Sequence, residues 1–125
     1  MKFAILSTMA AICQVALSNA ITPALTWKAA EEWCIKNDKG HLANPTISSI
    51  GQQCPDESCW IGLHRIKDRY NEWVITNYLA FDNLNWGTRQ PDNYLRREAC
   101  GQIYKQGSIL NDNDCTLQMR GICEF

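Results

Sequence analysis

The chain has 125 residues, enough for one domain and too few for two. Its 12 basic and 13 acidic side chains leave a formal net charge of −1 without basic runs, which argues against a protein that binds nucleic acid by neutralising phosphates. A composition of 46% hydrophobic and 20% charged residues also excludes a disordered segment. Seven cysteines in so short a chain predict either a disulfide framework or a metal site.

The first segment of the chain has the features of a secretory signal peptide. A single lysine is followed by a mostly apolar stretch over residues 3–17, and Ser18 and Ala20 suit the −3 and −1 positions of a cleavage site. The apolar stretch is too short and too interrupted to insert into a membrane. We therefore predict a signal peptide over residues 1–20 and a secreted, extracellular protein. A second interpretation, in which Cys13–Leu25 is the first strand of the folded domain, stays open.

Removal of that segment leaves a domain over residues 21–125 with an even number of cysteines. An even number in an oxidising compartment predicts three disulfides. Zinc is disfavoured, because the spacings do not form paired CxxC motifs and the two histidines lie elsewhere. Only four residues separate Cys54 from Cys59, so this pair can close locally. The remaining cysteines are Cys34, Cys54, Cys59, Cys100, Cys115 and Cys123.

Two helices are predicted near the start of the domain. Thr26 is a suitable N-cap for a helix over residues 27–36, whose apolar face carries Cys34 inward. The segment Asn37–Gly40 ends this helix. A second helix of about two turns is predicted to start at Asn44–Pro45, because proline suits the first helical position.

Short runs of aromatic and branched residues then predict strands, so the fold class is α+β, with two helices and mostly antiparallel sheets. Between the strands, residues 77–98 form a long stretch without periodicity. A loop of that length in a small domain is usually functional, and its aromatic residues, including Trp86, predict that it is ordered. The predicted strands are Trp60–Leu63, Trp73–Ile75, Gly101–Tyr104, Ser108–Leu110 and Arg120–Cys123.

Oxygen-bearing side chains gather in and after this loop. Amide and carboxylate oxygens are the ligands that calcium takes in numbers of six to eight. A disulfide between Cys100 and Cys115 would bring Glu98 close to Asn111 and Asp112. Asn and Asp are also common in loops because they form turns, so a calcium site and ordinary turn chemistry both remain open from these residues alone. The candidate ligands are Gln90, Asp92, Glu98, Asn111 and Asp112.

Several short motifs follow one another between Thr26 and Phe125. They are Trp27 and Cys34 on a helix, Gly40–Ala43, Trp60–Leu63, Gln90–Asp92, Glu98 with Cys100, Asn111–Asp112 with Cys115, and Gly121–Cys123. In these motifs and their order the chain resembles the C-type lectin domain family. The resemblance implies a C-type lectin-like fold with a long ordered calcium- and sugar-binding loop. It also implies the disulfides Cys34–Cys123 and Cys100–Cys115, which leaves Cys54–Cys59 as an additional local pair.

The resemblance further implies one calcium ion, held by Gln90, Asp92, Glu98, Asn111 and Asp112, and a sugar that coordinates this ion through two vicinal hydroxyls. The Gln-Pro-Asp order resembles the galactose-selecting subset of the family, whereas Glu-Pro-Asn marks the mannose subset. Galactose binders also place an aromatic ring against the sugar, and Tyr94 stands where that ring would come, although it could instead be a packing residue. Ala99 occupies a position that is acidic in members with a second calcium, so only one site is expected.

The sequence is thus interpreted as a secreted, calcium-dependent lectin for galactose-terminated glycans, and as no enzyme, because His41 and His64 have no nucleophile arrangement beside them. A single shallow sugar site is weak, so a homo-oligomer of at least two copies is expected. The alternative is a C-type-lectin-like module that binds proteins without sugar, as in venom-type or ice-binding relatives. Such relatives have typically lost calcium ligands, and this chain retains all five candidates.

Overall fold

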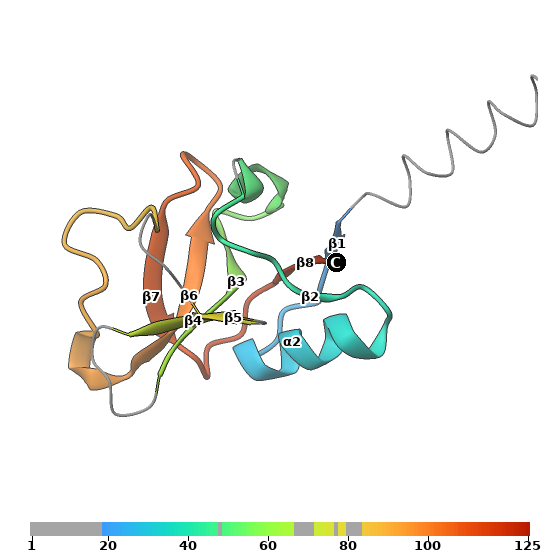
Figure 1. The fold of residues 1–125 in the computed structure, drawn as a ribbon, viewed down its shortest axis with the longest axis horizontal. Helices are drawn as coiled ribbons and strands as arrows, with labels where there is room; N and C mark the ends of the chain where they lie inside the picture. Colours follow the sequence, from blue (N-terminus) through green and yellow to red (C-terminus); the bar gives the residue numbers. More distant parts are fainter. Residues whose placement is uncertain (1–18, 48, 67–71, 77, 80–83) are drawn as a thin grey trace, which may run out of the picture.

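A computed structural model describes residues 19–47, 49–66, 72–76, 78–79 and 84–125, with 78–79 described as backbone only. The predicted signal peptide lies outside these residues except for its last two positions, as do residues 77 and 80–83 of the predicted loop. The helices are α2 (Trp27–Lys36) and the short 3-10 helices η1 (Ile50–Gln53) and η2 (Tyr94–Arg96) (Figure 1). The strands are β1 (Ala20–Ile21), β2 (His41–Leu42), β3 (Ser58–Arg65), β4 (Trp73–Ile75), β5 (Tyr78–Leu79), β6 (Glu98–Tyr104), β7 (Leu110–Asp114) and β8 (Ile122–Glu124).

Helix α2 forms where its local sequence predicts it. The Thr26 side chain accepts a hydrogen bond from the backbone N–H of Ala29 at 3.3 Å, which satisfies one of the free donors of the first turn. Ala30 and Cys34 are buried on the inner face. The helix ends at Asn37, whose backbone N–H donates to the carbonyl of Trp33. The predicted helix over residues 27–36 is therefore confirmed.

The predicted second helix is wrong. Between Pro45 and Cys59 the described residues contain the short 3-10 helix η1 and no α-helix. The chain enters η1 through Ser49, which has a left-handed conformation, and Gly51 packs so closely that an added Cβ would lie 2.5 Å from the backbone oxygen of Tyr104. The left-handed Ser49 interrupts a regular helix, and the short turn that follows it buries Ile50 in the core.

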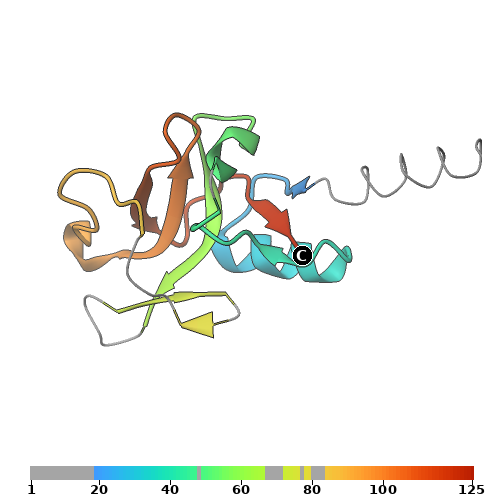
Figure 2. The same ribbon diagram turned by 45° about the horizontal axis from the view of Figure 1, so that its top comes forward.

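Two antiparallel sheets form the body of the domain. The strand orders are β1-β8-β2 and β5-β4-β3-β6-β7, and α2 packs beside the smaller sheet (Figure 2). Four of the predicted strands overlap β3, β4, β6 and β8. The fifth, predicted over Ser108–Leu110, is shifted, because β7 begins at Leu110 and extends to Asp114. Polar residues that read as a loop in the sequence are thus part of a strand.

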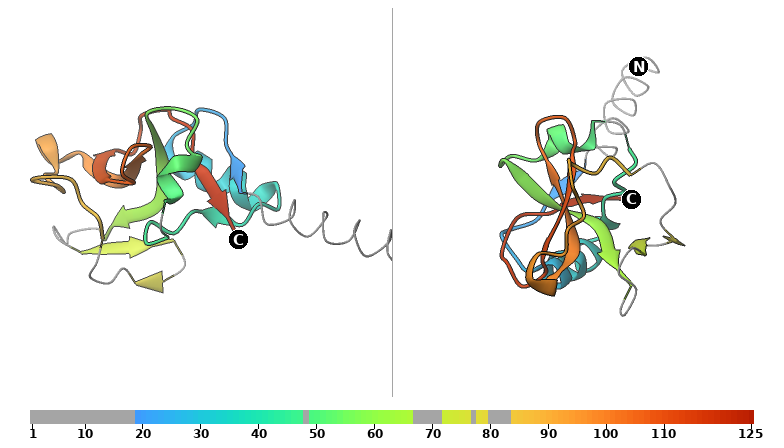
Figure 3. Two further views of the ribbon diagram at one scale, coloured as in Figure 1. Left: turned by 90° about the horizontal axis from the view of Figure 1, so that it is seen from above. Right: turned by 90° about the vertical axis from the view of Figure 1, so that its left-hand side faces the viewer.

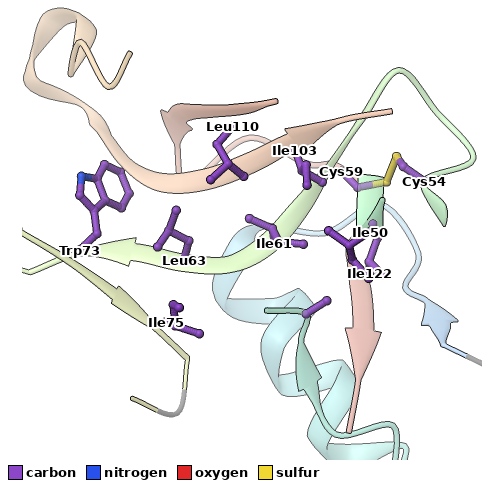
Figure 4. Packing of buried hydrophobic residues seen from close by; sticks show 11 residues of the cluster. Ile50, Cys54, Cys59, Ile61, Leu63, Trp73, Ile75, Ile103, Leu110 and Ile122 are labelled. Carbon is purple, nitrogen blue, oxygen red and sulfur yellow. A yellow bond between two sulfur atoms is a disulfide. The ribbon is translucent and has the colours of Figure 1, made fainter. Parts of the chain in front are cut away.

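The main core lies where β3, β6 and β7 meet η1 and β8. The side chains of Ile61 and Leu63 point from β3 toward Ile103 and Leu110 on the neighbouring strands (Figure 4). These four side chains are fully buried. The local Cys54–Cys59 disulfide caps one end of this cluster, and Trp73 caps the other.

Three disulfides join Cys34 to Cys123, Cys54 to Cys59 and Cys100 to Cys115. The first ties α2 to the last strand. The third ties β6 to the end of β7, next to the loop that precedes β6. Strands β1 and β8 are neighbours, so the two ends of the described chain lie at one end of the domain, and the loop carrying η2 lies at the other (Figure 3). Within the described residues, no helix has the length and apolar character needed to cross a membrane.

Candidate functional site

Residues 84–97, called the site loop below, connect the β4–β5 region to β6. Its base is held by Trp86, whose ring lies 4.9 Å from that of Trp73, and by a hydrogen bond from the backbone N–H of Gly87 to the carbonyl of Leu110 at 2.9 Å. Trp86 is partly buried against the core. It is therefore a packing residue that fixes where the loop leaves the sheet.

The tip of the site loop is attached to Asp112 on β7. The Asp112 side chain is fully buried. Its Oδ1 accepts the backbone N–H of Asp92 at 3.1 Å, and its Oδ2 accepts the backbone N–H of Asn93 at 2.7 Å. One carboxylate thus holds two successive peptide groups of the loop.

Glu98, the first residue of β6, holds the other side of the tip. Its Oε1 accepts the backbone N–H of Tyr94 at 3.1 Å, and its own N–H donates to the side chain of Asn93 at 3.1 Å. The register of β6 against β7 shifts between Glu98 and Cys100. Such a bulge re-aims a side chain at the end of a strand, and here it accompanies the turn of Glu98 toward the loop.

These contacts gather three carboxylates. Their ligand atoms all lie within 4.8 Å of one another, and the three residues are Asp92, Glu98 and Asp112. Crowding has an electrostatic effect. Burial, a hydrogen bond to Asp92 and the nearby acidic charges raise the pKa of Glu98 to about 7, and burial raises the pKa of Asp112.

The two amide candidates, Gln90 and Asn111, differ in whether their side chains have a hydrogen-bond partner. Gln90 is partly buried, and its Oε1 is enclosed without a hydrogen-bond donor among the described residues. Asn111 donates from Nδ2 to Oε1 of Gln102 at 2.8 Å, an acceptor that it shares with Asn113. The three crowded carboxylates are oxygens that suit a hard cation, and Gln90, two residues before Asp92 in the same loop, has a buried acceptor without a donor. The residues present therefore fit calcium.

Tyr94 projects from the tip of the loop. Its side chain is 66% exposed and the adjacent Leu95 is 67% exposed. Tyr94 does not pack into the core, so its ring is accessible to a ligand.

A basic residue at this site was missed by the sequence reasoning. Arg65, the last residue of β3, places Nη2 at 3.0 Å from Oδ2 of Asp112 and at 2.9 Å from the carbonyl oxygen of Glu98. Its guanidinium lies 4.6 Å from the ring centre of Trp73. The contact joins residues 47 positions apart, and no motif around Arg65 signals it.

Comparison with known proteins agrees with this fold. Residues 23–125 match the family described as Lectin C-type domain. The C-type lectin BfL-1 of Bungarus fasciatus is 31% identical over 111 residues, covering 79% of this chain and 70% of that protein. The chain belongs to the C-type lectin domain family. Members of this family are binding modules, so the protein is not an enzyme.

Solved structures with this fold include proteins with different activities. The carbohydrate-recognition domain of the human scavenger receptor C-type lectin superimposes with a TM-score of 0.69 at 27% identity, covering 82% of this chain and 84% of that one. Herring type II antifreeze protein superimposes with a TM-score of 0.66 at 25% identity, covering 84% and 87% of the two chains. The C-type lectin-like fold is thus established, and the ligand must be argued from the site.

Proposed function

We propose that this protein is a secreted, calcium-dependent lectin that selects galactose-type sugars. The observation that supports this most strongly is the cluster of Asp92, Glu98 and Asp112, whose ligand atoms lie within 4.8 Å of one another. Three carboxylates at this distance repel one another, and a divalent cation would relieve that repulsion. Gln90 has a buried oxygen without a hydrogen-bond donor among the described residues, and this oxygen would be a further ligand for the same ion.

One calcium ion would be held by Gln90, Asp92, Glu98, Asn111 and Asp112. When bound, it would supply coordination positions for two vicinal sugar hydroxyls. The residues themselves bind and orient the sugar: the amide of Gln90 donates from Nε2, whereas the carboxylate of Asp92 only accepts. This order of donor and acceptor distinguishes one hydroxyl pair from another. The exposed ring of Tyr94 would stack on the apolar face of the sugar.

The test is chromatography of the purified protein on immobilised galactose and immobilised mannose in calcium, followed by EDTA. Retention on galactose alone, with elution by EDTA, is the expected result. Flow-through on both columns, with calcium binding shown separately by calorimetry, would support the proposed calcium site and reject the proposed preference for galactose. Flow-through without calcium binding would favour the protein-binding or ice-binding alternative, for which the antifreeze structure sets a precedent in fold.

Secretion rests on the predicted signal peptide, and N-terminal sequencing of protein from the culture medium tests it. We expect the mature chain to begin at Ile21. Cleavage there separates the two residues of β1, Ala20 and Ile21, which pair with Cys123 and Ile122 of β8. A start upstream of Cys13 would instead support the interpretation of Cys13–Leu25 as part of the fold.

Self-association is proposed because one sugar site alone gives weak binding. Sedimentation equilibrium in calcium is expected to give a mass of at least two chains. A single-chain mass at working concentrations would contradict this part of the proposal and leave the sugar site untouched.

A further inference from the structure

We propose that Arg65 is a built-in cation that keeps the site loop ordered when calcium is absent. The proposal concerns the calcium-free protein, and it rests on the proposed function only in naming calcium as the ion that the loop later meets. Arg65 is a positioning residue, because it acts through Asp112 and Glu98, the residues that hold the loop.

The geometry places Arg65 at the junction of three strands. Its Nη2 donates to Oδ2 of Asp112 on β7 at 3.0 Å, and Nη2 and Nε donate to the carbonyl oxygen of Glu98 on β6 at 2.9 and 3.3 Å. The planar guanidinium can reach both acceptors at once because its donors form a fixed fork. Packing against Trp73 holds the group from the other side.

Burial strengthens the ion pair between Arg65 and Asp112. The side chain of Asp112 is 0% exposed and that of Arg65 is 8% exposed, so water does not screen the pair. The same carboxylate accepts the backbone N–H groups of Asp92 and Asn93. The guanidinium therefore fixes the position of a carboxylate that in turn holds both peptide groups of the loop.

The functional consequence is preorganisation. If Arg65 already supplies the positive charge that Asp112 needs, calcium does not have to order the loop when it binds. The cost of fixing the loop backbone is then met during folding, and binding does not lose that free energy.

Limited trypsin digestion in EDTA tests this directly, because Arg89, Arg96 and Arg97 are exposed cleavage sites within the loop. The full chain with its disulfides intact is digested in calcium and in EDTA, and cleavage at each site is timed by mass spectrometry. The wild-type loop is expected to be cleaved at similar rates in both buffers. Arg65→Met keeps an unbranched apolar side chain that can pack near Trp73 but removes the charge and the hydrogen-bond donors. Its loop should be cleaved at least tenfold faster in EDTA.

Three comparisons keep the result specific. Arg65→Lys keeps the charge without the fork and should give an intermediate rate. Arg120→Met is the matched control, since Arg120 is half-exposed and 3.6 Å from Asp56, away from the loop. Cleavage after Lys28 in α2 reports global unfolding and should stay slow in every variant.

Rapid cleavage of the wild-type loop in EDTA would overturn the proposal, however the variants behave. Equal protection of Arg65→Met and wild type in EDTA would overturn it as well, and so would global unfolding of Arg65→Lys. Loop protection that depends on Arg65 in a protein that binds neither calcium nor galactose would support this inference while rejecting the proposed function.

Discussion

At the scale of single residues, Asp112 has two roles, of which the sequence indicates only the first. It is a candidate calcium ligand, and it is also the acceptor for two peptide groups of the site loop and for Arg65. Replacing Asp112 by alanine is therefore expected to abolish calcium and sugar binding together, partly by releasing the loop. Specificity is better tested at Gln90 and Asp92, because Asp92 is exposed and Gln90 is only partly buried.

The double substitution Gln90→Glu and Asp92→Asn exchanges the positions of the hydrogen-bond donor and acceptor. We expect preference to move from galactose to mannose, by about tenfold or more, because an unpaired polar group in a contact costs about 1–3 kcal/mol. Competitive elution with each free sugar measures the change. A variant that still binds calcium and still prefers galactose would disprove the donor–acceptor explanation.

Glu98 predicts a pH dependence of calcium binding. Its pKa is raised to about 7 by burial, by the hydrogen bond to Asp92 and by neighbouring acidic charges, so the ion-free site is partly protonated at neutral pH. Calcium needs the ionised form, and binding therefore releases protons. Affinity should be constant well above pH 7 and should fall as pH decreases below 7, approaching about tenfold per pH unit. Calorimetric titration at pH 8, 7 and 6 tests this, and an unchanged Kd would contradict it.

At the scale of elements, the end of β8 contains a carboxyl group with an unfavourable environment. Burial raises the pKa of Glu124, although its Oε1 accepts the backbone N–H of Asn44. Because the folded state binds this proton more tightly than the unfolded state, stability is lost as pH rises from the ordinary pKa through the raised one.

Glu124→Gln keeps the acceptor and removes the charge, so it is expected to raise the free energy of unfolding at pH 7. The gain over wild type should vanish at pH 4, where Glu124 is protonated in the folded protein. Thermal unfolding at both pH values measures this. Glu32→Gln, at an exposed position on α2, is the control and should change little. A loss of stability at pH 7 would show that the charge is favourable.

Elements with local signals could be predicted from the sequence, and contacts between distant segments could not. Helix α2 follows from its N-cap and its apolar spacing, which are properties of adjacent residues. The second helix failed because the left-handed Ser49 interrupts it soon after the start signal at Pro45. The polar residues Asn111–Asp114 resembled a loop because their strand carries site residues instead of an apolar face.

In the candidate site, too, the residues in short motifs could be predicted and the contacts between distant segments could not. Gln90, Asp92 and Glu98 belong to short motifs close together in the sequence, and the structure places Asp92 and Glu98 together with Asp112. Arg65 could not be predicted because its partners lie 33 and 47 residues away. The sharing of Gln102 by Asn111 and Asn113 depends on the register of β6 against β7, which the sequence does not specify either.

At the scale of the whole molecule, the disulfides differ in how much chain they constrain. Cys34–Cys123 spans 89 residues and Cys54–Cys59 spans 5. Loop-closure entropy predicts a loss of about 5 kcal/mol when the long bridge is removed and about 2 kcal/mol for the short one. All four cysteines are buried, so the cavities left by paired alanine substitutions are comparable.

Urea unfolding of Cys34→Ala with Cys123→Ala, and of Cys54→Ala with Cys59→Ala, measures these losses. The first pair is expected to unfold at a much lower urea concentration than the second, or not to fold at all. Equal midpoints would show that the effect of the bridges does not come from the length of chain they enclose.

The pairing of β1 with β8 determines how the domain can be attached to something else. Both ends of the described chain emerge on the side opposite the site loop, as the views in Figures 1 and 3 agree. An affinity tag or a chip surface joined after Phe125 would therefore leave Tyr94 and its neighbours facing outward. A stalk or a fused protein at the same end would likewise leave the site loop at the far end of the domain, pointing away from the attachment.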